Sequence, residues 1–401
     1  MAETLAQIAS RNQAQAAQRH ARTRRQQVRG WALQLAARMP VLPAPHDDRT
    51  IVLIRPDHLG DVLLTTPAIR ALAAAHPESR LVALVGPWSA SVISAYPEID
   101  LTVTLPFPGF TRRTTRPGLA PYRMAIYWAR RLRALRATAA VVFRPDHWWG
   151  GLLAYLAGIP RRVGFDLPDV RPFLTEKYAF RPAHAVLHNA ELVSGWTGPL
   201  AAEQLELSFP VNPAARERVE GMLRERGLEP AMPRVIIHPG AGTSIKQWPV
   251  ENWVTVADTL AETWGAPIIF TGTDREIPQV RAITERMKAP ALMLAGETGI
   301  DELAALYADA RVVLGPDSGP LHLAAAVHTP TVSLFGPADP EEFGPWGDPA
   351  KHRVLTSEIA CRPCRIIDWP GATPDEHPCV RNIPPEAVIS AALQAAATHP
   401  G

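Results

Sequence analysis

Cysteine and long apolar runs are both scarce in this chain of 401 residues. The three cysteines all lie between residues 361 and 379, which excludes the disulfide framework of a small secreted protein. No apolar run approaches the roughly 18 residues of a membrane-spanning helix. The N-terminus also lacks an apolar signal core, so we expect the chain to stay in the cytoplasm.

The chain has no strong charge imbalance. Its 41 basic and 39 acidic residues leave a net charge of +2, too small to indicate a nucleic-acid binder. Two glycine fingerprints are also missing, because the loops Leu59–Leu64 and Gly240–Lys246 match neither G-x-G-x-x-G nor G-x-x-x-x-G-K-[ST]. Their absence disfavours a dinucleotide-dependent oxidoreductase and a Walker-type nucleotide hydrolase.

Apolar segments of strand length alternate with helical patterns in two series. The first series has predicted strands at Ile51–Arg55, Leu81–Val85, Leu101–Leu105, Ala140–Phe143 and Arg162–Phe165. The second has them at Val235–His238, Pro267–Phe270, Ala291–Leu294, Val312–Leu314 and Thr331–Phe335. Nearly continuous apolar strands between helices predict parallel sheets covered on both faces. We therefore expect an α/β protein with an N-terminal extension (1–45) and two doubly wound Rossmann-like domains (46–207 and 208–401).

The most informative segment is Val312–Ala326, which reads VVLGPDSGPLHLAAA. Its strand runs through a tight turn into a helix that Pro320 opens, where the missing N–H costs nothing. The free N–H groups of such a helix N-terminus suit a phosphate. An ordinary capped strand-to-helix turn is the alternative interpretation. The candidate ligand-binding residues of this segment are Asp317, Ser318, Gly319 and His322.

A second segment, Val235–Trp253, runs from an apolar strand into a loop of glycines and hydroxyls that ends in lysine. Such a loop approaches an anion closely, donates hydrogen bonds to it and adds a point charge. Arginine outnumbers lysine 37 to 4 in this chain, which argues against an arbitrary cation in this loop, although a solvated loop lysine is the alternative. The candidate residues are Gly240, Gly242, Thr243, Ser244 and Lys246.

A third segment, Ile51–Arg70, places Gly60 and Asp61 between a strand and a helix predicted over Val62–Ala75. The helix dipole favours an ionised carboxylate at this position. Asp61 therefore suits either an N-cap or a carboxylate that must stay ionised to accept a proton.

Together the three segments resemble glycosyltransferase family 9, the ADP-heptose:lipopolysaccharide heptosyltransferases. The resemblance spans about residues 50 to 395. It is carried by Gly60-Asp61, by His238-Pro239-Gly240-Ala241 with Lys246 and Trp248-Pro249, by Asp317-Ser318-Gly319 with His322, by Thr331–Pro340, and by Cys361-x-x-Cys364 through Cys379. It implies the GT-B architecture, in which two Rossmann-like domains face each other across a cleft, with the acceptor on the N-terminal domain and the donor on the C-terminal one.

The resemblance also implies an inverting, metal-independent sugar transfer without a cofactor. The donor would be a nucleotide-diphosphate sugar, with ADP-heptose favoured, and Asp61 would take the proton from the acceptor hydroxyl. Lys246 would stabilise the departing diphosphate and Asp317 would hold donor sugar hydroxyls. By family position, Glu276 would bind the donor ribose and Thr298 would line the base pocket. A non-catalytic sugar-nucleotide-binding or scaffold protein of the same fold is the alternative.

The acceptor that the resemblance implies is an anionic glycolipid of the lipopolysaccharide core or a related glycan. Arginines of the N-terminal domain suit such an acceptor, although a solvated basic helix face is the alternative. The candidate acceptor residues are Gly60, Arg112, Arg113 and Arg116. The cysteines, with His377, suit either a metal or packed reduced thiols, and the thiols are favoured.

Residues 1–40 carry seven arginines and a single acidic residue, Glu3. Val28, Trp31 and Leu35 fall on one face of a predicted helix. A basic amphipathic helix of this kind suits peripheral contact with the inner face of the cytoplasmic membrane. A helix packed on the enzyme's own surface, or a solvated extension, is the alternative.

Overall fold

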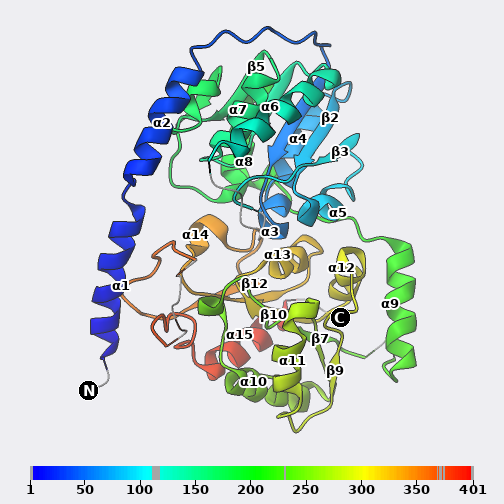
Figure 1. The fold of residues 1–401 in the computed structure, drawn as a ribbon. Coiled ribbons are helices and arrows are strands. Elements are labelled where there is room, and N and C mark those ends of the chain that lie inside the picture. Colours follow the sequence, from blue (N-terminus) through cyan, green and yellow to red (C-terminus); the bar gives the residue numbers. More distant parts are fainter. Residues whose placement is uncertain are drawn as a thin grey trace. The chain divides into compact units, whose positions relative to one another are not determined.

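The chain folds into two compact units in a computed structural model that describes residues 3–110, 118–229, 232–367, 369, 373 and 375–398. We call Arg22–Glu206 the N-terminal unit, and Leu207–Gly401 together with Met1–Ala21 the C-terminal unit. Each unit contains one six-stranded sheet in which every pairing is parallel. Figure 1 shows helices packed around both sheets. The prediction of two doubly wound α/β domains is therefore confirmed.

The sheet of the N-terminal unit has the strand order β3-β2-β1-β4-β5-β6. Its strands are β1 (Thr50–Arg55), β2 (Arg80–Val85), β3 (Leu101–Thr104), β4 (Ala139–Val142), β5 (Arg161–Phe165) and β6 (Glu176–Tyr178). Its α-helices are α2 (Arg24–Ala36), α3 (Leu59–Leu63), α4 (Thr66–Ala75), α5 (Ala90–Ile93), α6 (Ala120–Leu132), α7 (Trp148–Leu156) and α8 (Ala185–Thr197). Every residue of β1 is buried, which explains the unbroken apolar pattern of its sequence.

The sheet of the C-terminal unit repeats this order as β9-β8-β7-β10-β11-β12. Its strands are β7 (Val235–Ile237), β8 (Ile268–Phe270), β9 (Ala291–Met293), β10 (Val312–Pro316), β11 (Thr331–Phe335) and β12 (His352–Thr356). Its α-helices are α1 (Leu5–His20), α9 (Pro213–Glu225), α10 (Val250–Trp264), α11 (Ile277–Thr284), α12 (Ile300–Ala308), α13 (Gly319–Ala326), α14 (Pro340–Phe343) and α15 (Pro385–Ala397).

This strand order indicates where each sheet would bind a ligand. The order reverses between β1 and β4 in one sheet and between β7 and β10 in the other, and ligands of such sheets bind at the carboxyl ends of strands at that point. All three sequence segments run from these strands into the loops that follow them: Ile51–Arg70 from β1, Val235–Trp253 from β7 and Val312–Ala326 from β10. The fold thus places the strand-to-loop junctions of the three segments at the two switch points.

One predicted helix is wrong in its extent. The pattern predicted a single helix over Val62–Ala75, whereas the structure contains the short α3 and then α4. Pro67 stands in the first turn of α4, where its missing N–H costs nothing. In the interior of one continuous helix over Val62–Ala75 the same residue would remove a backbone hydrogen bond, so the helix is divided. Asp61 consequently lies in the first turn of α3, and His58 is the N-cap residue.

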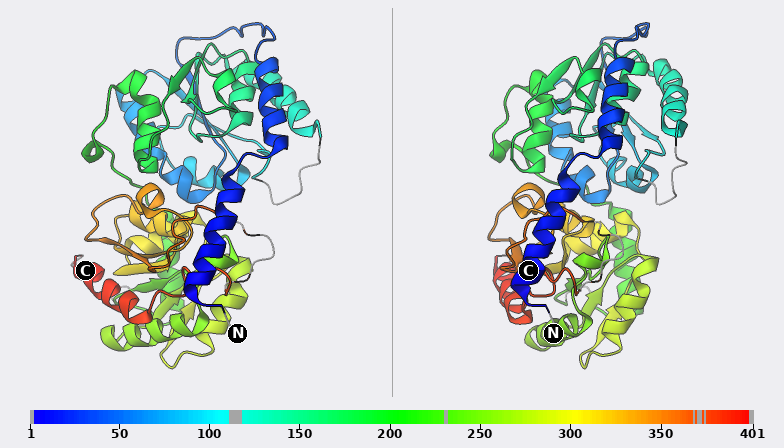
Figure 2. Two further views of the ribbon diagram at one scale, coloured as in Figure 1. Left: turned by 90° about the vertical axis from the view of Figure 1, so that its left-hand side faces the viewer. Right: turned by 60° about the vertical axis from the view of Figure 1, so that its left-hand side comes forward.

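The N-terminal extension divides between the two units. Helices α1 and α2 each begin with a capping box, Thr4 with Gln7 and Thr23 with Gln26. Helix α1 packs on the C-terminal unit, where Asn12 donates a hydrogen bond to the carbonyl of Glu376 at 3.0 Å. Helix α2 packs on the N-terminal unit (Figure 2). Among the described residues, no helix is both long and apolar enough to cross a membrane.

Candidate active site

The switch point of the C-terminal unit brings two predicted residues into direct contact. Lys246 Nζ lies 2.5 Å from Asp317 Oδ2 and 3.4 Å from the Asp317 carbonyl oxygen. Their side chains are only 14% and 8% exposed. The loop after β7 supplies the lysine and the loop after β10 supplies the aspartate. One nearly buried ion pair therefore joins the segments Val235–Trp253 and Val312–Ala326.

Glycines allow the surrounding loops to approach closely. A Cβ on Gly240 would lie 2.0 Å from Glu276 Oε1, and one on Gly315 would lie 2.5 Å from the His238 carbonyl oxygen. Glu276 accepts hydrogen bonds from the Thr273 backbone N–H at 2.7 Å and from its hydroxyl at 2.9 Å. Glu276, which is predicted to bind the donor ribose, thus lies against the loop after β7 that is predicted to bind the diphosphate.

Two hydroxyls of this region are buried, and neither has a hydrogen-bond partner among the described residues. They are Thr243 Oγ1 and Ser318 Oγ. Ser318 is the N-cap residue of α13, but its side chain makes no capping hydrogen bond. A buried polar group without a partner is costly, and a bound ligand can supply the missing bond. With Lys246 and the N-terminus of α13, these hydroxyls form a set of donors suited to an anion.

A buried hydrogen-bonded chain beneath the loop was not predicted. His238 Nδ1 lies 3.0 Å from Thr271 Oγ1, which lies 3.1 Å from the Tyr307 hydroxyl. Burial lowers the pKa of His238 and raises the pKa of Tyr307, so both groups are neutral near pH 7. The sequence signal was His238 itself, a polar residue directly at the end of an apolar strand.

The other predicted donor residues also lie at this end of the sheet. His322 is buried in α13, and Gly319 is the first residue of that helix. Gly242 and Ser244 are exposed in the loop after β7, and Thr298 is half-buried in the loop after β9. The loop after β7 is anchored by buried Trp248, whose Nε1 donates a hydrogen bond to the Ile383 carbonyl at 3.1 Å.

At the switch point of the N-terminal unit, Asp61 is paired with a residue that was not predicted. Arg55 Nη2 lies 3.3 Å from Asp61 Oδ1. The Arg55 side chain is 8% exposed and that of Asp61 is 36% exposed. The Asp61 carboxylate thus lies beside a guanidinium and is partly exposed to solvent. Gly60, a predicted acceptor residue, is buried beside it in α3.

Asp61 stands at the end of a chain of alternating charges. Buried Asp57 pairs with Arg55 at 3.0 Å and also with Arg144, which pairs in turn with Asp146 at 2.8 Å. Burial opposes ionisation of Asp57, but the positive charges of Arg55 and Arg144 outweigh it and lower its pKa. The pKa of Arg144 is raised, because the attraction of Asp57 and Asp146 exceeds the cost of burial.

A repeated tetrapeptide encodes this chain of charges. Arg-Pro-Asp-His occurs as residues 55–58 and again as residues 144–147, at the carboxyl ends of the neighbouring strands β1 and β4. The second histidine, His147, is buried among Phe107, Phe110 and Trp149, and burial lowers its pKa to about 4. The repeat is the sequence signal that could have found these residues.

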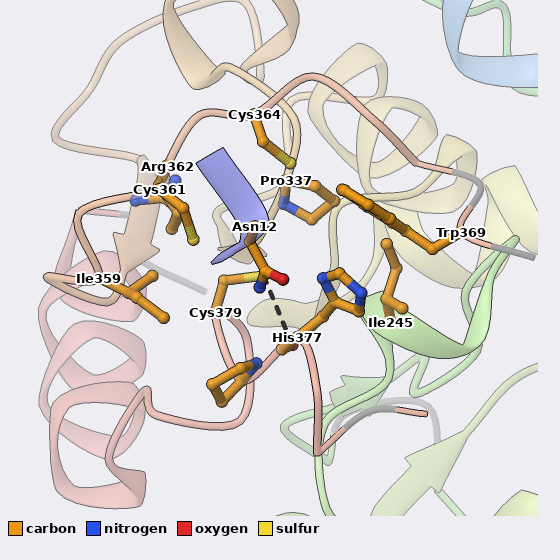
Figure 3. A pocket seen from close by; sticks show the side chains of 11 residues that line it. Asn12, Ile245, Pro337, Ile359, Cys361, Arg362, Cys364, Trp369, His377 and Cys379 are labelled. Carbon is orange, nitrogen blue, oxygen red and sulfur yellow. Dashed lines mark hydrogen bonds between the residues drawn. The ribbon is translucent and has the colours of Figure 1, made fainter. Parts of the chain in front are cut away.

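The three predicted acceptor arginines, Arg112, Arg113 and Arg116, lie outside the described residues. The cysteines gather around a small pocket of the C-terminal unit, into which Asn12 of α1 points (Figure 3). Burial raises the pKa of Cys379 to about 12 and also raises that of Cys361, so both are protonated thiols. Within the described ranges, no three His, Cys, Asp or Glu side chains are placed to hold a metal ion.

Comparison with known proteins decides the family. The model of glycosyltransferase family 9 (heptosyltransferase) matches residues 128–368. The chain belongs to this family. It is 26% identical over 298 residues to lipopolysaccharide heptosyltransferase 3 of Escherichia coli, covering 72% of this chain and 84% of the relative.

Solved structures of the family share its fold. A family 9 glycosyltransferase of Veillonella parvula superposes with a TM-score of 0.75 at 23% identity, covering 89% of this chain and all of the other. The Escherichia coli heptosyltransferase WaaC, solved with ADP, gives 0.58 at 20% identity, covering 74% of this chain and 91% of WaaC. The protein is therefore a glycosyltransferase of the heptosyltransferase family, with the GT-B fold that the resemblance implied.

Proposed function

We propose that this protein transfers a heptose from ADP-heptose to a hydroxyl of the lipopolysaccharide core or a related cell-surface glycan. The observation that carries the proposal is the Lys246–Asp317 pair with the unpartnered hydroxyls of Thr243 and Ser318 beside it. Relatives support the choice of donor, since WaaC was solved with ADP and also with ADP-2-deoxy-2-fluoro heptose. The matched lipopolysaccharide heptosyltransferase supports the choice of acceptor.

The donor diphosphate would bind at the N-terminus of α13. Lys246 would neutralise the negative charge that grows on the departing diphosphate, and the hydroxyls of Thr243 and Ser318 would donate to its oxygens. Glycines 240, 242 and 319 and Ser244 would admit the diphosphate close to the backbone. Asp317 and His322 would face the donor sugar, Glu276 the ribose and Thr298 the base.

Asp61 would act as the general base in an inverting transfer that needs no metal. Its carboxylate would take the acceptor proton as the acceptor oxygen bonds to the anomeric carbon and the diphosphate departs. A carboxylate is a weak base, but the hydroxyl grows acidic as its oxygen forms that bond. Arg55 would hold Asp61 ionised until this moment. Gly60 and Arg112, Arg113 and Arg116 would contact the anionic acceptor.

A thermal-shift panel of ADP-, UDP-, GDP- and CDP-sugars tests the choice of donor. A ligand that binds only the folded protein raises its melting temperature. We expect ADP-heptose to raise it more than the other three classes do, and Lys246→Ala to remove that rise. A larger shift with a UDP-, GDP- or CDP-sugar would contradict the proposed donor. A shift with ADP-heptose but no turnover on any core acceptor would indicate a binding protein instead.

A further inference from the structure

Exposed apolar side chains are concentrated on one part of the N-terminal unit. Of the twelve large apolar side chains that are exposed in the described residues, eight lie in two short segments. They are Val28, Trp31, Leu35, Met39 and Leu42 in or just after α2, and Leu119, Ile126 and Tyr127 in or just before α6. Trp31 is 65% exposed and Leu42 is 80% exposed. We call these eight residues the α2–α6 patch.

The unit itself holds α2 in place. Gly30 and Leu33 are buried on its inner face, and Leu33 belongs to the core of the unit. Arg29 pairs with Asp169 at 2.6 Å, and the Tyr155 hydroxyl donates to the Ala37 carbonyl at 3.1 Å. The outer face of α2 is therefore a fixed surface rather than part of a solvated tail. Trp148 at the start of α7 links the two helices, since its ring centre lies 5.4 Å from the Arg29 guanidinium of α2 and 5.5 Å from the Tyr122 ring of α6.

The same surface is strongly basic. No acidic residue occurs from residue 4 to residue 46 or from residue 101 to residue 145. The exposed arginines of the two helices and their flanks include Arg24, Arg25, Arg38, Arg123, Arg130 and Arg131. The guanidinium of Arg131 lies 4.6 Å from the centre of the Tyr127 ring. Cationic and apolar side chains thus occur together on α2 and α6, and Asp169, the carboxylate that contacts this region, is paired with Arg22 and Arg29.

We propose that the α2–α6 patch docks the N-terminal unit on an anionic lipid membrane. Tryptophan and tyrosine favour the boundary between lipid headgroups and acyl chains, and arginines attract anionic headgroups. Scattered leucine, methionine and valine side chains can enter that boundary without the fixed complementary surface that a protein partner must supply. The sequence alone suggested the whole of residues 1–40 for this role, but α1 packs on the C-terminal unit and is not part of the patch.

Sedimentation with vesicles tests the apolar part of the patch. We expect the full-length protein to bind phosphatidylglycerol-containing vesicles at low salt and to ignore vesicles of phosphatidylcholine alone. The triple variant Trp31→Ser, Met39→Ser, Leu42→Ser should bind at least tenfold more weakly. The matched control Leu5→Ser, Leu393→Ser removes two exposed apolar side chains from the C-terminal unit and should bind like the wild type. Unchanged melting temperatures show that the variants fold.

A charge variant tests the basic part. Replacing Arg24, Arg25 and Arg38 by glutamine should weaken anionic-vesicle binding at least tenfold and flatten its salt dependence, since each arginine near the surface contributes about fivefold. Arg281→Gln, an exposed arginine of α11, is the control. Equal binding to both vesicle types, or triple variants that bind like the wild type, would overturn the proposal.

Light scattering distinguishes a membrane from a second copy of the chain as the occupant of the patch. A dimer that the apolar triple variant abolishes, without vesicle binding by the wild type, would assign the patch to a second copy and overturn the membrane role. The vesicles contain neither nucleotide nor acceptor, so a failure to bind them would leave the proposed sugar transfer untouched. Failure of the sugar transfer would equally leave vesicle binding untouched.

Discussion

The two units share a strand order and a switch point, yet they present different chemistry there. In the C-terminal unit a single nearly buried pair, Lys246–Asp317, lies beside hydroxyls and a helix N-terminus. In the N-terminal unit a chain of alternating charges ends at Asp61, which is partly exposed. The shared fold decides where a site lies, and the loops decide what it does.

This difference matches two different tasks. A diphosphate needs positive charge and hydrogen-bond donors, and the C-terminal unit supplies both. A proton acceptor needs an accessible carboxylate, and Asp61 is 36% exposed with the Arg55 guanidinium 3.3 Å away. Our proposal assigns donor binding to one unit and proton removal to the other, so variants should separate the two.

The largest expected effect is on catalysis and comes from the N-terminal unit. Asp61→Asn should lower kcat at least ~100-fold, the usual scale for loss of a general base, while ADP affinity stays unchanged. Steady-state kinetics and calorimetry check the two halves of this statement. The control is Asp146→Asn, the exposed carboxylate at the far end of the charged chain, which should keep kcat within a few-fold. Turnover by Asp61→Asn near the wild-type rate would remove Asp61 from the mechanism.

The next effect is on donor binding and comes from the C-terminal unit. Lys246→Ala should weaken ADP binding roughly 10- to 100-fold, the scale of a lost charge-assisted hydrogen bond together with an uncompensated Asp317. Lys288→Ala, another lysine of the same unit and an exposed one, should leave the affinity unchanged.

The paired aspartate sharpens this test. In Lys246→Ala the buried Asp317 carboxylate loses its partner and repels the diphosphate. Adding Asp317→Asn should therefore restore part of the ADP affinity and of the melting temperature. An unaltered dissociation constant for Lys246→Ala, with an unaltered single-turnover rate, would contradict the assignment of the donor site.

Much of the fold of both units could be predicted from the sequence. All ten predicted strands are present, because nearly continuous apolar segments are typical of parallel strands with both faces covered. Strands β6 and β12 were missed. Strand β6 is the three-residue Glu-Lys-Tyr edge of its sheet, with no apolar pattern to mark it.

The site was predicted unevenly for a physical reason. Lys246, Asp317 and Asp61 stand beside glycines at strand ends, and that local pattern marks them. Arg55 and Arg144 lie 89 residues apart in sequence and both contact Asp57 only because β1 and β4 pair. The contact of Glu276 with Gly240 likewise depends on the pairing of β7 with β8.

Each unit also contains a buried histidine that should make its stability depend on pH. Burial lowers the pKa of His147 in the N-terminal unit and of His352 in the C-terminal unit to about 4. Both are neutral when folded near pH 6 but protonate on unfolding, so stability should fall as the pH drops from about 6.5 toward 4. We expect about 1 kcal/mol per residue between pH 6.5 and 5.5.

Denaturant unfolding at these two pH values measures this effect. His352→Gln should reduce the pH dependence, and so should His147→Met. The control His46→Gln replaces an exposed histidine and should leave the pH dependence unchanged. Equal pH dependence in all four proteins would contradict the burial argument.

The smallest expected effect is a difference in stability between substitutions at two glycines of the loop after β7. Gly240→Ala should lower the free energy of unfolding by about 1 kcal/mol, because its Cβ would displace Glu276. A Cβ on Gly242 meets nothing within 4 Å, so Gly242→Ala should leave stability unchanged or slightly raised. Thermal unfolding of the two variants measures the contrast, and equal melting temperatures would contradict the described packing of Glu276.

The most direct test of the central claim is acceptor-dependent release of ADP. Purified protein is mixed with ADP-heptose and a lipopolysaccharide core that lacks its terminal heptose, and ADP is measured over time. We predict release with both substrates present, little with either alone, and at least ~100-fold slower release by Asp61→Asn. No release with both substrates, or equal release without the acceptor, would contradict the proposed transfer.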